Sequence, residues 1–365
     1  MSKDPFMIYH FYGGVRGYRP HGTDVFIEPV LPRTEQVVVS VKDCIPGQKL
    51  TDIFGCIVGV EWIDNRLQAK GLLPTWWSIN HYNPVGLSRE LSEKLSQIRS
   101  SAFEQSRFEL YESVNKLQSW LDATIRAFKR LSNSYHSVLS IRCVSGQFKG
   151  DAPFTDMNCD SVFDSMHNFL YYIGTLRDHI SEFIVLHIAK GMPAKLKDDP
   201  KMVNLKNTLK KNIDSYGIES LKQHILDAYD TKSDSDWPGW LYILGRYRNI
   251  ITHERPIQMF NHHAWLFQQM KNIQGVEYPR LKFPIPGHPF MFDFEIPRGH
   301  SDLDTKRKMV APNKESMRKD PDGMEYCWMV FDRLMRFLSS VVSLSPIEPK
   351  IQLIVPHGPV TFGTI

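Results

Sequence analysis

Hydrophobic positions follow two different periods along the chain. Up to about residue 85, β-branched and aromatic residues form short runs, DVFIEPVL, EQVVVSV and FGCIVGVEWI, separated by Pro and Gly. Runs of this kind predict β-strands. The segment TWWSINHYNPVG, which follows them, predicts a loop. We therefore expect a β-rich region over residues 1–87.

From residue 88 to residue 345 the hydrophobic residues recur at steps of three and four, which is typical of amphipathic helices. Such segments include FELYESVNKLQSWLDATIRAFKRL, SVFDSMHNFLYYIGTLRDHISEFIVLHIAKG, GIESLKQHILDAY, WPGWLYILGRYRNIITHE and MEYCWMVFDRLMRFLSSVVSL. Their number and length predict a helical bundle. The expected fold class is therefore mainly α, with a β-rich N-terminal region, or α+β overall.

Two segments depart from the helical pattern. Residues 256–320 are rich in proline, and a loop of this length is unusual inside a compact domain. We expect an ordered insertion, because the four phenylalanines Phe283, Phe290, Phe292 and Phe294 would be costly to expose. The tail, residues 346–365, contains IQLIVPHGPVTF and resembles a strand.

Composition excludes several classes of protein. The 44 basic residues barely exceed the 40 acidic ones, so the net charge of +4 does not by itself indicate a nucleic-acid binder. The five cysteines are scattered without a C-x-x-C pair, which disfavours a disulfide framework or a zinc knuckle. Neither a signal peptide nor a run of roughly 18 apolar residues is visible, so we expect a cytoplasmic protein with no membrane partner.

The segment GRYRNIITHERP, residues 245–256, places polar residues on an otherwise apolar helix. At about 100° per residue, Asn249 and His253 lie within roughly 40° of each other, while Arg248 lies further round the helix. Pro256 disfavours helical geometry at the preceding residue, which places His253 in the last turn. There the helix dipole favours a protonated imidazole.

These three residue types suit the cleavage of a phosphodiester without a metal. Histidine accepts a proton from an attacking 2′-hydroxyl or donates one to the leaving oxygen. Arginine holds the phosphate and stabilises the charge that develops on its oxygens, and asparagine orients it. A mechanism that uses the 2′-hydroxyl would make RNA the substrate.

The segment RNIITH, from Arg248 to His253, resembles the Arg-polar-x-x-x-His motif of HEPN-domain proteins. The resemblance covers about residues 100–345 and implies a compact helical bundle that usually forms a homodimer, with two motif helices meeting at a shared cleft. Many such proteins are metal-independent endoribonucleases that act as toxins or in anti-phage defence. The resemblance therefore implies catalytic roles for Arg248, Asn249 and His253, with no cofactor and no metal.

Two alternatives stay open at the motif. Other members of the family only bind nucleotides or RNA, so this chain could be a non-catalytic binding or protein-interaction module. The resemblance also allows an antitoxin or another partner protein. Without the resemblance, basic residues at a helix C-terminus are explained as a solvated helix end.

Further candidates lie upstream and downstream of the motif. Arg177 and Asp178 could contribute RNA-binding groups to the same cleft, or they could form a surface ion pair. The lysine-rich segment Lys190–Lys211 could follow an RNA backbone or form a solvated face. Its candidate RNA-binding residues are Lys206, Lys210 and Lys211.

A metal site is not expected in HERPIQMFNHH. This segment contains His253, Glu254, His262 and His263, but Ile257 occupies the position of the second histidine in an H-E-x-x-H motif. The preceding proline also breaks the helix that this motif requires.

Overall fold

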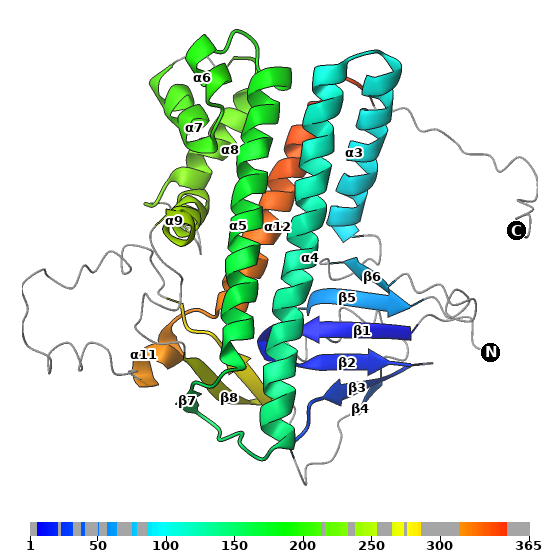
Figure 1. The fold of residues 1–365 in the computed structure, drawn as a ribbon, viewed down its shortest axis with the longest axis vertical. Helices are drawn as coiled ribbons and strands as arrows, with labels where there is room; N and C mark the ends of the chain where they lie inside the picture. Colours follow the sequence, from blue (N-terminus) through cyan, green and yellow to red (C-terminus); the bar gives the residue numbers. More distant parts are fainter. Residues whose placement is uncertain are drawn as a thin grey trace, which may run out of the picture.

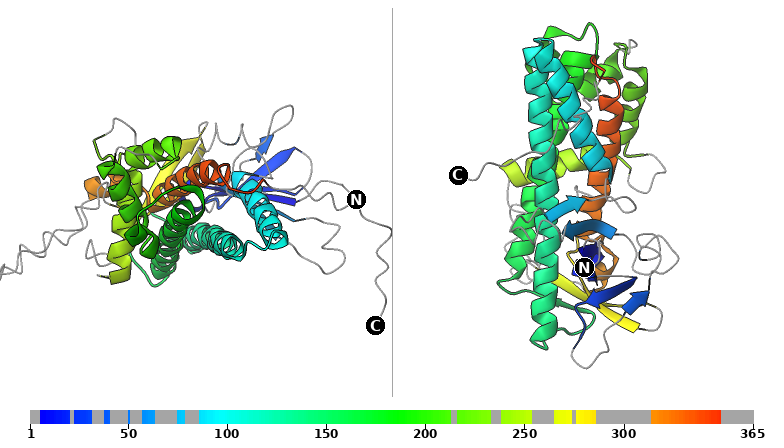
Figure 2. Two further views of the ribbon diagram at one scale, coloured as in Figure 1. Left: turned by 90° about the horizontal axis from the view of Figure 1, so that it is seen from above. Right: turned by 90° about the vertical axis from the view of Figure 1, so that its right-hand side faces the viewer.

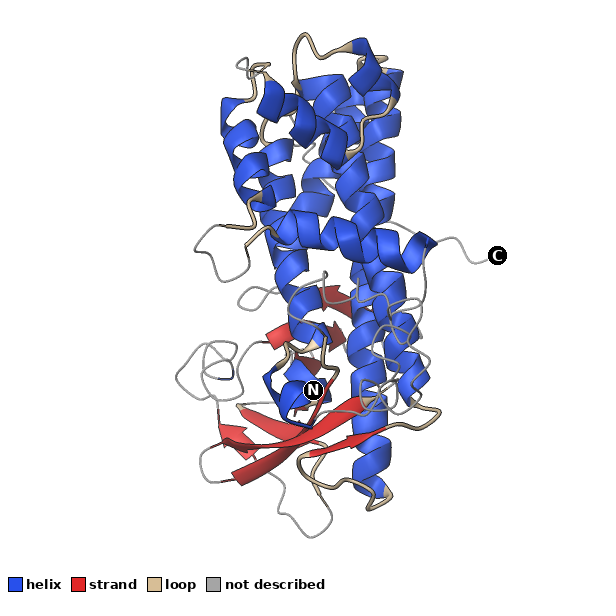
Figure 3. Cartoon of the chain, turned by 90° about the vertical axis from the view of Figure 1, so that its left-hand side faces the viewer, coloured by secondary structure: helices blue, strands red, loops and turns tan. Residues whose placement is uncertain are grey.

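The computed structural model describes residues 6–20, 23–31, 38–40, 50, 57–63, 75–78, 86–212, 216–232, 238–253, 265–273, 276–285 and 314–348. Within these ranges the protein is an α+β structure (Figure 1). The strands gather at one end of the molecule and the helices extend away from them (Figure 3). The expected α+β class is confirmed, and no HEPN assignment follows from helix content alone.

The N-terminal region forms an antiparallel sheet of six described strands in the order β4-β3-β2-β1-β5-β6. Their bounds are β1 Phe6–Phe11, β2 Arg16–Arg19, β3 Asp24–Glu28, β4 Val38–Ser40, β5 Ile57–Ile63 and β6 Thr75–Ser78. Three of these strands lie in the runs that predicted them. The prediction of a loop over TWWSINHYNPVG is wrong at its start, because Thr75–Ser78 pairs with β5. A Thr-Trp-Trp sequence suits a pleated sheet surface, which explains the strand.

Long helices form the rest of the fold. The first three are α3 Gly86–Glu104, α4 Phe108–Val144 and α5 Cys159–Phe183, which a π-helical turn, Ile184–Ile188, extends. Smaller helices follow: α6 Ala194–Asp198, α7 Met202–Lys211, α8 Glu219–Tyr229 and α9 Trp240–His253. The last is α12 Gly323–Val342, which packs against α3, α4 and α5 (Figure 2). Every segment with helical periodicity therefore contains a helix.

The proline-rich segment contains structure that its composition did not predict. β8 Leu266–Ile273 pairs with β9 Val276–Lys282 and with β7 Ala152–Phe154, which gives a second, three-stranded antiparallel sheet. Pro279 lies in β9, at the edge of this sheet, where a missing N–H is tolerated. A short helix, α11 Lys314–Lys319, follows. Phe283 is buried, as expected, whereas Phe290, Phe292 and Phe294 lie outside the described residues.

Helix α4 connects the sheet to the bundle. Its 37 residues span about 55 Å. One end contacts the six-stranded sheet, where His136 Nδ1 lies 2.8 Å from the carbonyl oxygen of Gly14. Along its length α4 packs against α5, and α5 in turn packs against α9, so that α5 lies between the other two (Figure 1). The helix that carries the RNIITH motif, α9, therefore lies on the side of α5 that faces away from α4.

Residues 349–365 lie outside the described residues, so the strand-like tail stays a prediction. In the part of the chain that the structure describes, no helix has both the length and the apolar character needed to cross a membrane.

Candidate functional site

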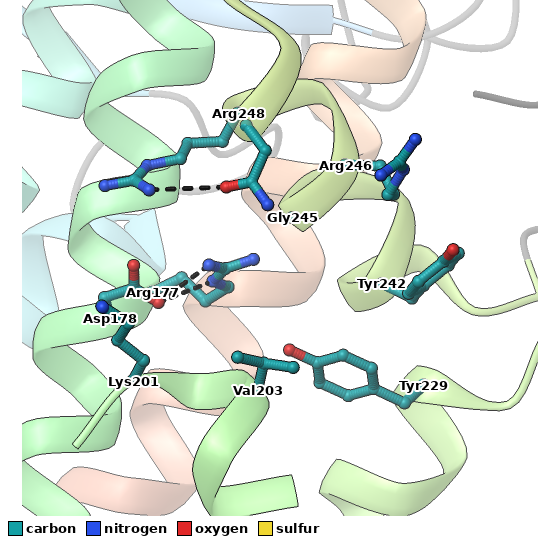
Figure 4. A pocket seen from close by; sticks show the side chains of 10 residues that line it. Arg177, Asp178, Lys201, Val203, Tyr229, Tyr242, Gly245, Arg246 and Arg248 are labelled. Carbon is teal, nitrogen blue, oxygen red and sulfur yellow. Dashed lines mark hydrogen bonds and ion pairs between the residues drawn. The ribbon is translucent and has the colours of Figure 1, made fainter. Parts of the chain in front are cut away.

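A cavity of about 480 Å³ lies where α5, α7, α8 and α9 come together (Figure 4). This volume is within the range of small-ligand sites, roughly 300–1,000 Å³. Four predicted site residues, Arg177, Asp178, Arg248 and Asn249, line it together. The other lining residues are Lys201, Val203, Tyr229, Tyr242, Gly245 and Arg246.

The motif helix α9 holds its arginine and asparagine by burying the opposite face. Leu241, Leu244 and Tyr247 are fully buried in the bundle core and Ile251 is partly buried against it, so the apolar side of this helix faces the bundle. Arg248 and Asn249 therefore project away from the core, into the cavity. Arg248 Nη1 lies 3.5 Å from Asn249 Oδ1, so the two side chains face each other (Figure 4).

Helix α5 supplies to the same cavity an ion pair in which the arginine is buried and the aspartate is partly exposed. Arg177 donates from Nε and Nη2 to Asp178 Oδ1, at 3.1 and 2.8 Å. Only 5% of Arg177 is exposed, so the interpretation of this pair as a surface ion pair does not hold. A buried guanidinium needs charged or polar partners, and a single carboxylate uses only part of its donor capacity.

The opposite wall of the cavity is aromatic. Tyr229, at the end of α8, has a pKa raised to about 12, because burial disfavours the phenolate more than the nearby charge of Arg177 favours it, and the carboxylate of Asp178 adds to the effect of burial. The phenol therefore keeps its proton and serves as a neutral donor. Lys206 Nζ lies 5.3 Å from the ring centroid of Tyr229. Burial and the neighbouring Lys210 lower the pKa of Lys206, which lies behind this wall.

Positive charge dominates the described lining. Arg177, Arg246, Arg248 and Lys201 are cationic, and Asp178 is the only acidic residue among the described lining residues. Lys201 also contacts Asp199, at 3.2 Å, in an exposed pair that contributes little. A concave, cationic site with donors on fixed helices is suited to an anion such as a phosphate group.

The remaining predicted residues are distributed differently. The backbone of His253 ends α9, one turn beyond Asn249, but its side chain lies outside the described residues, as do Glu254, His262 and His263. Lys210 and Lys211 end α7 and are exposed, and neither they nor Lys206 line the cavity. Among the described residues, no group of three His, Cys, Asp or Glu side chains is arranged to hold a metal.

Sequence reasoning missed four lining residues that carry chemistry or shape, Val203, Tyr229, Tyr242 and Arg246, and included Lys201 only as part of the lysine-rich segment. A signal for two of them exists in the motif helix. Tyr242, Arg246 and Asn249 follow the i, i+4, i+7 spacing of one helix face. This face points into the cavity. The others come from α7 and α8, whose position relative to α9 the sequence does not show.

Comparisons with known proteins found no matching family model, no matching curated protein and no matching solved structure. The resemblance to HEPN proteins therefore rests on the motif RNIITH and its place at the end of a bundle helix. Function has to be inferred from the site itself.

Proposed function

We propose that this protein is a metal-independent endoribonuclease of the HEPN type, acting as a homodimer on RNA. In this proposal His253 transfers protons between the attacking 2′-hydroxyl and the leaving oxygen. Arg248 binds the scissile phosphate and stabilises the charge that develops on it, and Asn249 orients it. Arg177 adds a second guanidinium deeper in the cavity.

The observation that supports the proposal is the convergence of these groups. Arg248 and Asn249 come from α9, and Arg177 comes from α5, yet all three line one cavity. Arg177 and Asp178 lie 70 residues or more before the motif, so their presence in the same cavity is independent of the motif pattern. Two arginines at one site are suited to holding a phosphate group between them.

The test is cleavage of a labelled RNA, with and without EDTA, by the wild-type protein and two variants. We expect His253→Ala to lose roughly 10²–10⁴-fold in rate, because a general acid/base contributes about that much. Arg248→Ala should lose about 10²–10³-fold, as expected for one group that stabilises transition-state charge. Activity should persist in EDTA, since no step requires a metal.

Arg130→Ala is the matched control, because Arg130 is an exposed arginine on α4 and does not line the cavity. It should cleave RNA at the wild-type rate. Cleavage by His253→Ala at the wild-type rate would contradict the assigned role, and loss of activity in EDTA would indicate a metal enzyme instead.

A non-catalytic nucleotide- or RNA-binding module is the second candidate. The observation that favours it is that the described lining contains cations, phenols and an amide, which are sufficient for binding an anion. In that case wild-type protein would bind RNA through Arg248 and leave it uncut. Binding and cleavage measured on the same RNA separate the two candidates.

A further inference from the structure

Four aromatic rings form a cluster on the α4–α5 pair, apart from the cavity. Trp120 of α4 lies at its centre, and His179 of α5 stacks on it with ring centroids 5.8 Å apart and an interplanar angle of 25°. Tyr172 lies 5.8 Å from Trp120, and Tyr171 meets it edge-on at 6.3 Å. We call Trp120, Tyr171, Tyr172 and His179 the aromatic platform.

The aromatic platform is partly open to solvent and is held in place. Tyr171 is 43% exposed, and the other three side chains are half-buried. His179 Nδ1 lies 2.8 Å from Glu182 Oε2, and Lys116 Nζ lies 3.4 Å from Glu182 Oε1. These contacts fix the imidazole against the indole, so the cluster presents ring surface without needing to rearrange.

The aromatic platform begins where the cavity ends. Asp178 lines the cavity, and the next residue, His179, stacks on Trp120. Consecutive helical residues differ by about 100° in direction, so α5 turns one side chain toward α9 and the next toward α4. Tyr171 lies seven residues before Asp178, which corresponds to nearly the same face and about 10 Å along the helix. A ligand that leaves the cavity across α5 therefore meets these rings.

We infer that the aromatic platform binds a base of a single-stranded RNA whose phosphate group occupies the cavity, an inference that rests on the proposed function. Single-stranded nucleic acids are bound by cationic grooves next to aromatic rings, because phosphates need cations and every base has a face that stacks. The cavity supplies the cations and the aromatic platform supplies the rings. The site would therefore accept an RNA strand of several nucleotides.

Electrostatics along this path are compatible with a polyanion. Asp178, which lines the cavity, is already paired with Arg177, and Glu182, which contacts His179 of the platform, is already paired with Lys116. A protein partner is the competing occupant. The RNA strand is favoured because the rings lie next to the cationic cavity along α5 and are bordered by charged groups, whereas the core of a protein–protein interface is depleted of charge.

The test uses the full-length protein and 2′-O-methyl oligonucleotides, which lack the attacking hydroxyl and so report binding alone. The ligands are a fluorescent oligonucleotide of about eight nucleotides, within the site sizes of single-strand binders, and inorganic phosphate. Trp120→Ala should weaken oligonucleotide binding about 5- to 150-fold, the effect of losing one base stack. Affinity for inorganic phosphate should stay unchanged, because phosphate occupies only the cavity and has no base to stack.

Trp120 also packs against the core, so Trp120→Ala could lose binding by misfolding, and two further variants distinguish this from the loss of a base stack. Trp120→Phe keeps a ring and should retain most of the affinity. Tyr171→Ala removes the most exposed ring and should show a smaller loss than Trp120→Ala. Phe103→Ala is the control, because Phe103 is 60% exposed but contacts Phe108 and Tyr111 rather than the platform.

The outcomes separate this inference from the proposed function. If wild-type protein cuts RNA while Trp120→Ala and Tyr171→Ala bind the oligonucleotide normally, the aromatic platform does not bind RNA. That result would overturn the inference and favour a protein partner as its occupant. If the protein cuts no RNA but loses oligonucleotide binding in both variants, the inference stands and the ribonuclease proposal fails. Failure of the wild-type protein to bind the oligonucleotide would overturn the inference.

Discussion

Arg248 of α9 lies directly across Gly174 of α5, with no room for a side chain between them. A Cβ atom on Gly174 would lie 2.6 Å from Arg248 Cγ. The reverse relationship holds one turn along, where a Cβ on Gly245 of α9 would lie 2.5 Å from Arg177 Nη1 of α5. A glycine on each helix therefore leaves the space that an arginine of the other helix occupies. This close approach brings both guanidinium groups to the cavity.

Gly174→Ala should displace Arg248 and so weaken the site. The added methyl group would contact the stem of Arg248 near the backbone, where the side chain has little freedom to move. Alanine favours a helix over glycine by about 0.5–1 kcal/mol, but overpacking costs about 1–3 kcal/mol. We expect a net loss of stability in urea denaturation and a loss of RNA binding or cleavage of about 10-fold or more, because small displacements at such sites are costly.

A double variant tests the cause of this loss. Gly174→Ala combined with Arg248→Ala removes the closest contact, at Cγ, but leaves Arg248 Cβ, at 2.9 Å. Stability should be partly restored, with a coupling free energy of at least about 0.5 kcal/mol between the two positions. Strict additivity in the double variant would contradict a steric origin.

Asn168→Ala is the control for both variants, because Asn168 lies on the exposed side of the same helix and does not line the cavity. It introduces the same residue into α5 without placing a methyl group against Arg248. We expect it to leave RNA binding unchanged and to alter the free energy of unfolding by no more than about 0.5 kcal/mol, as is usual for a surface substitution.

Periodicity predicted the helices because the bundle buries one stripe of each. Val114, Leu117 and Leu121 of α4 are fully buried, as their spacing indicates. The strands β1 and β2 were not predicted, because polar or charged residues lie between the apolar residues of MIYHF and RGYR. The strands β8 and β9 were not predicted either, because LFQQMKNI and VEYPRLK are rich in polar residues and lie in a proline-rich segment. The pairings of β1 with β5 and of β7 with β8 join strands that are distant in the chain, which is a tertiary effect that short runs do not encode.

Only part of the candidate site could be predicted in the same way. Arg248 and Asn249 could be identified from the motif. The pair Arg177 and Asp178 could be identified from its place on the helix before the motif. The residues that close the cavity come from α7 and α8, and their contribution depends on how these helices pack. Tyr229, for example, ends an ordinary amphipathic helix and has no distinguishing local pattern. Tertiary packing, not spacing, makes it a cavity residue.

The lysines of α7 should differ in their effect on RNA binding. Lys201, which immediately precedes the helix, lines the cavity, whereas Lys211 ends it about 15 Å away. A lysine that neutralises a phosphate reduces the slope of log affinity against log salt by about one when it is removed. We expect this change for Lys201→Ala and a smaller one for Lys211→Ala, measured by titrating labelled RNA at several salt concentrations. Equal effects would indicate that RNA follows the whole helix.

A buried polar cluster joins the six-stranded sheet to α4. His10 of β1 is 1% exposed, and its Nδ1 lies 2.9 Å from Ser132 Oγ. Its Nε2 lies 3.2 Å from Glu61 Oε1, and the other oxygen of Glu61 pairs with Lys129 at 3.0 Å. Burial lowers the pKa of His10 to about 4, because it disfavours the imidazolium more than Glu61 favours it. Nearby Arg16 and His136 act in the same direction as burial.

Acid should therefore weaken the folded state through His10. The unfolded chain binds a proton at His10 near pH 6.5 and the folded chain only near pH 4, so the unfolded state holds more protons between these values. Stability falls as the pH is lowered through this window. Comparing wild type with His10→Gln by urea denaturation from pH 7 to pH 4, we expect the wild-type advantage to shrink by roughly 2–3 kcal/mol. A difference that stays constant with pH would mean that His10 takes up its proton at the same pH in the folded and the unfolded chain, so that the carboxylate of Glu61 would offset burial at this junction.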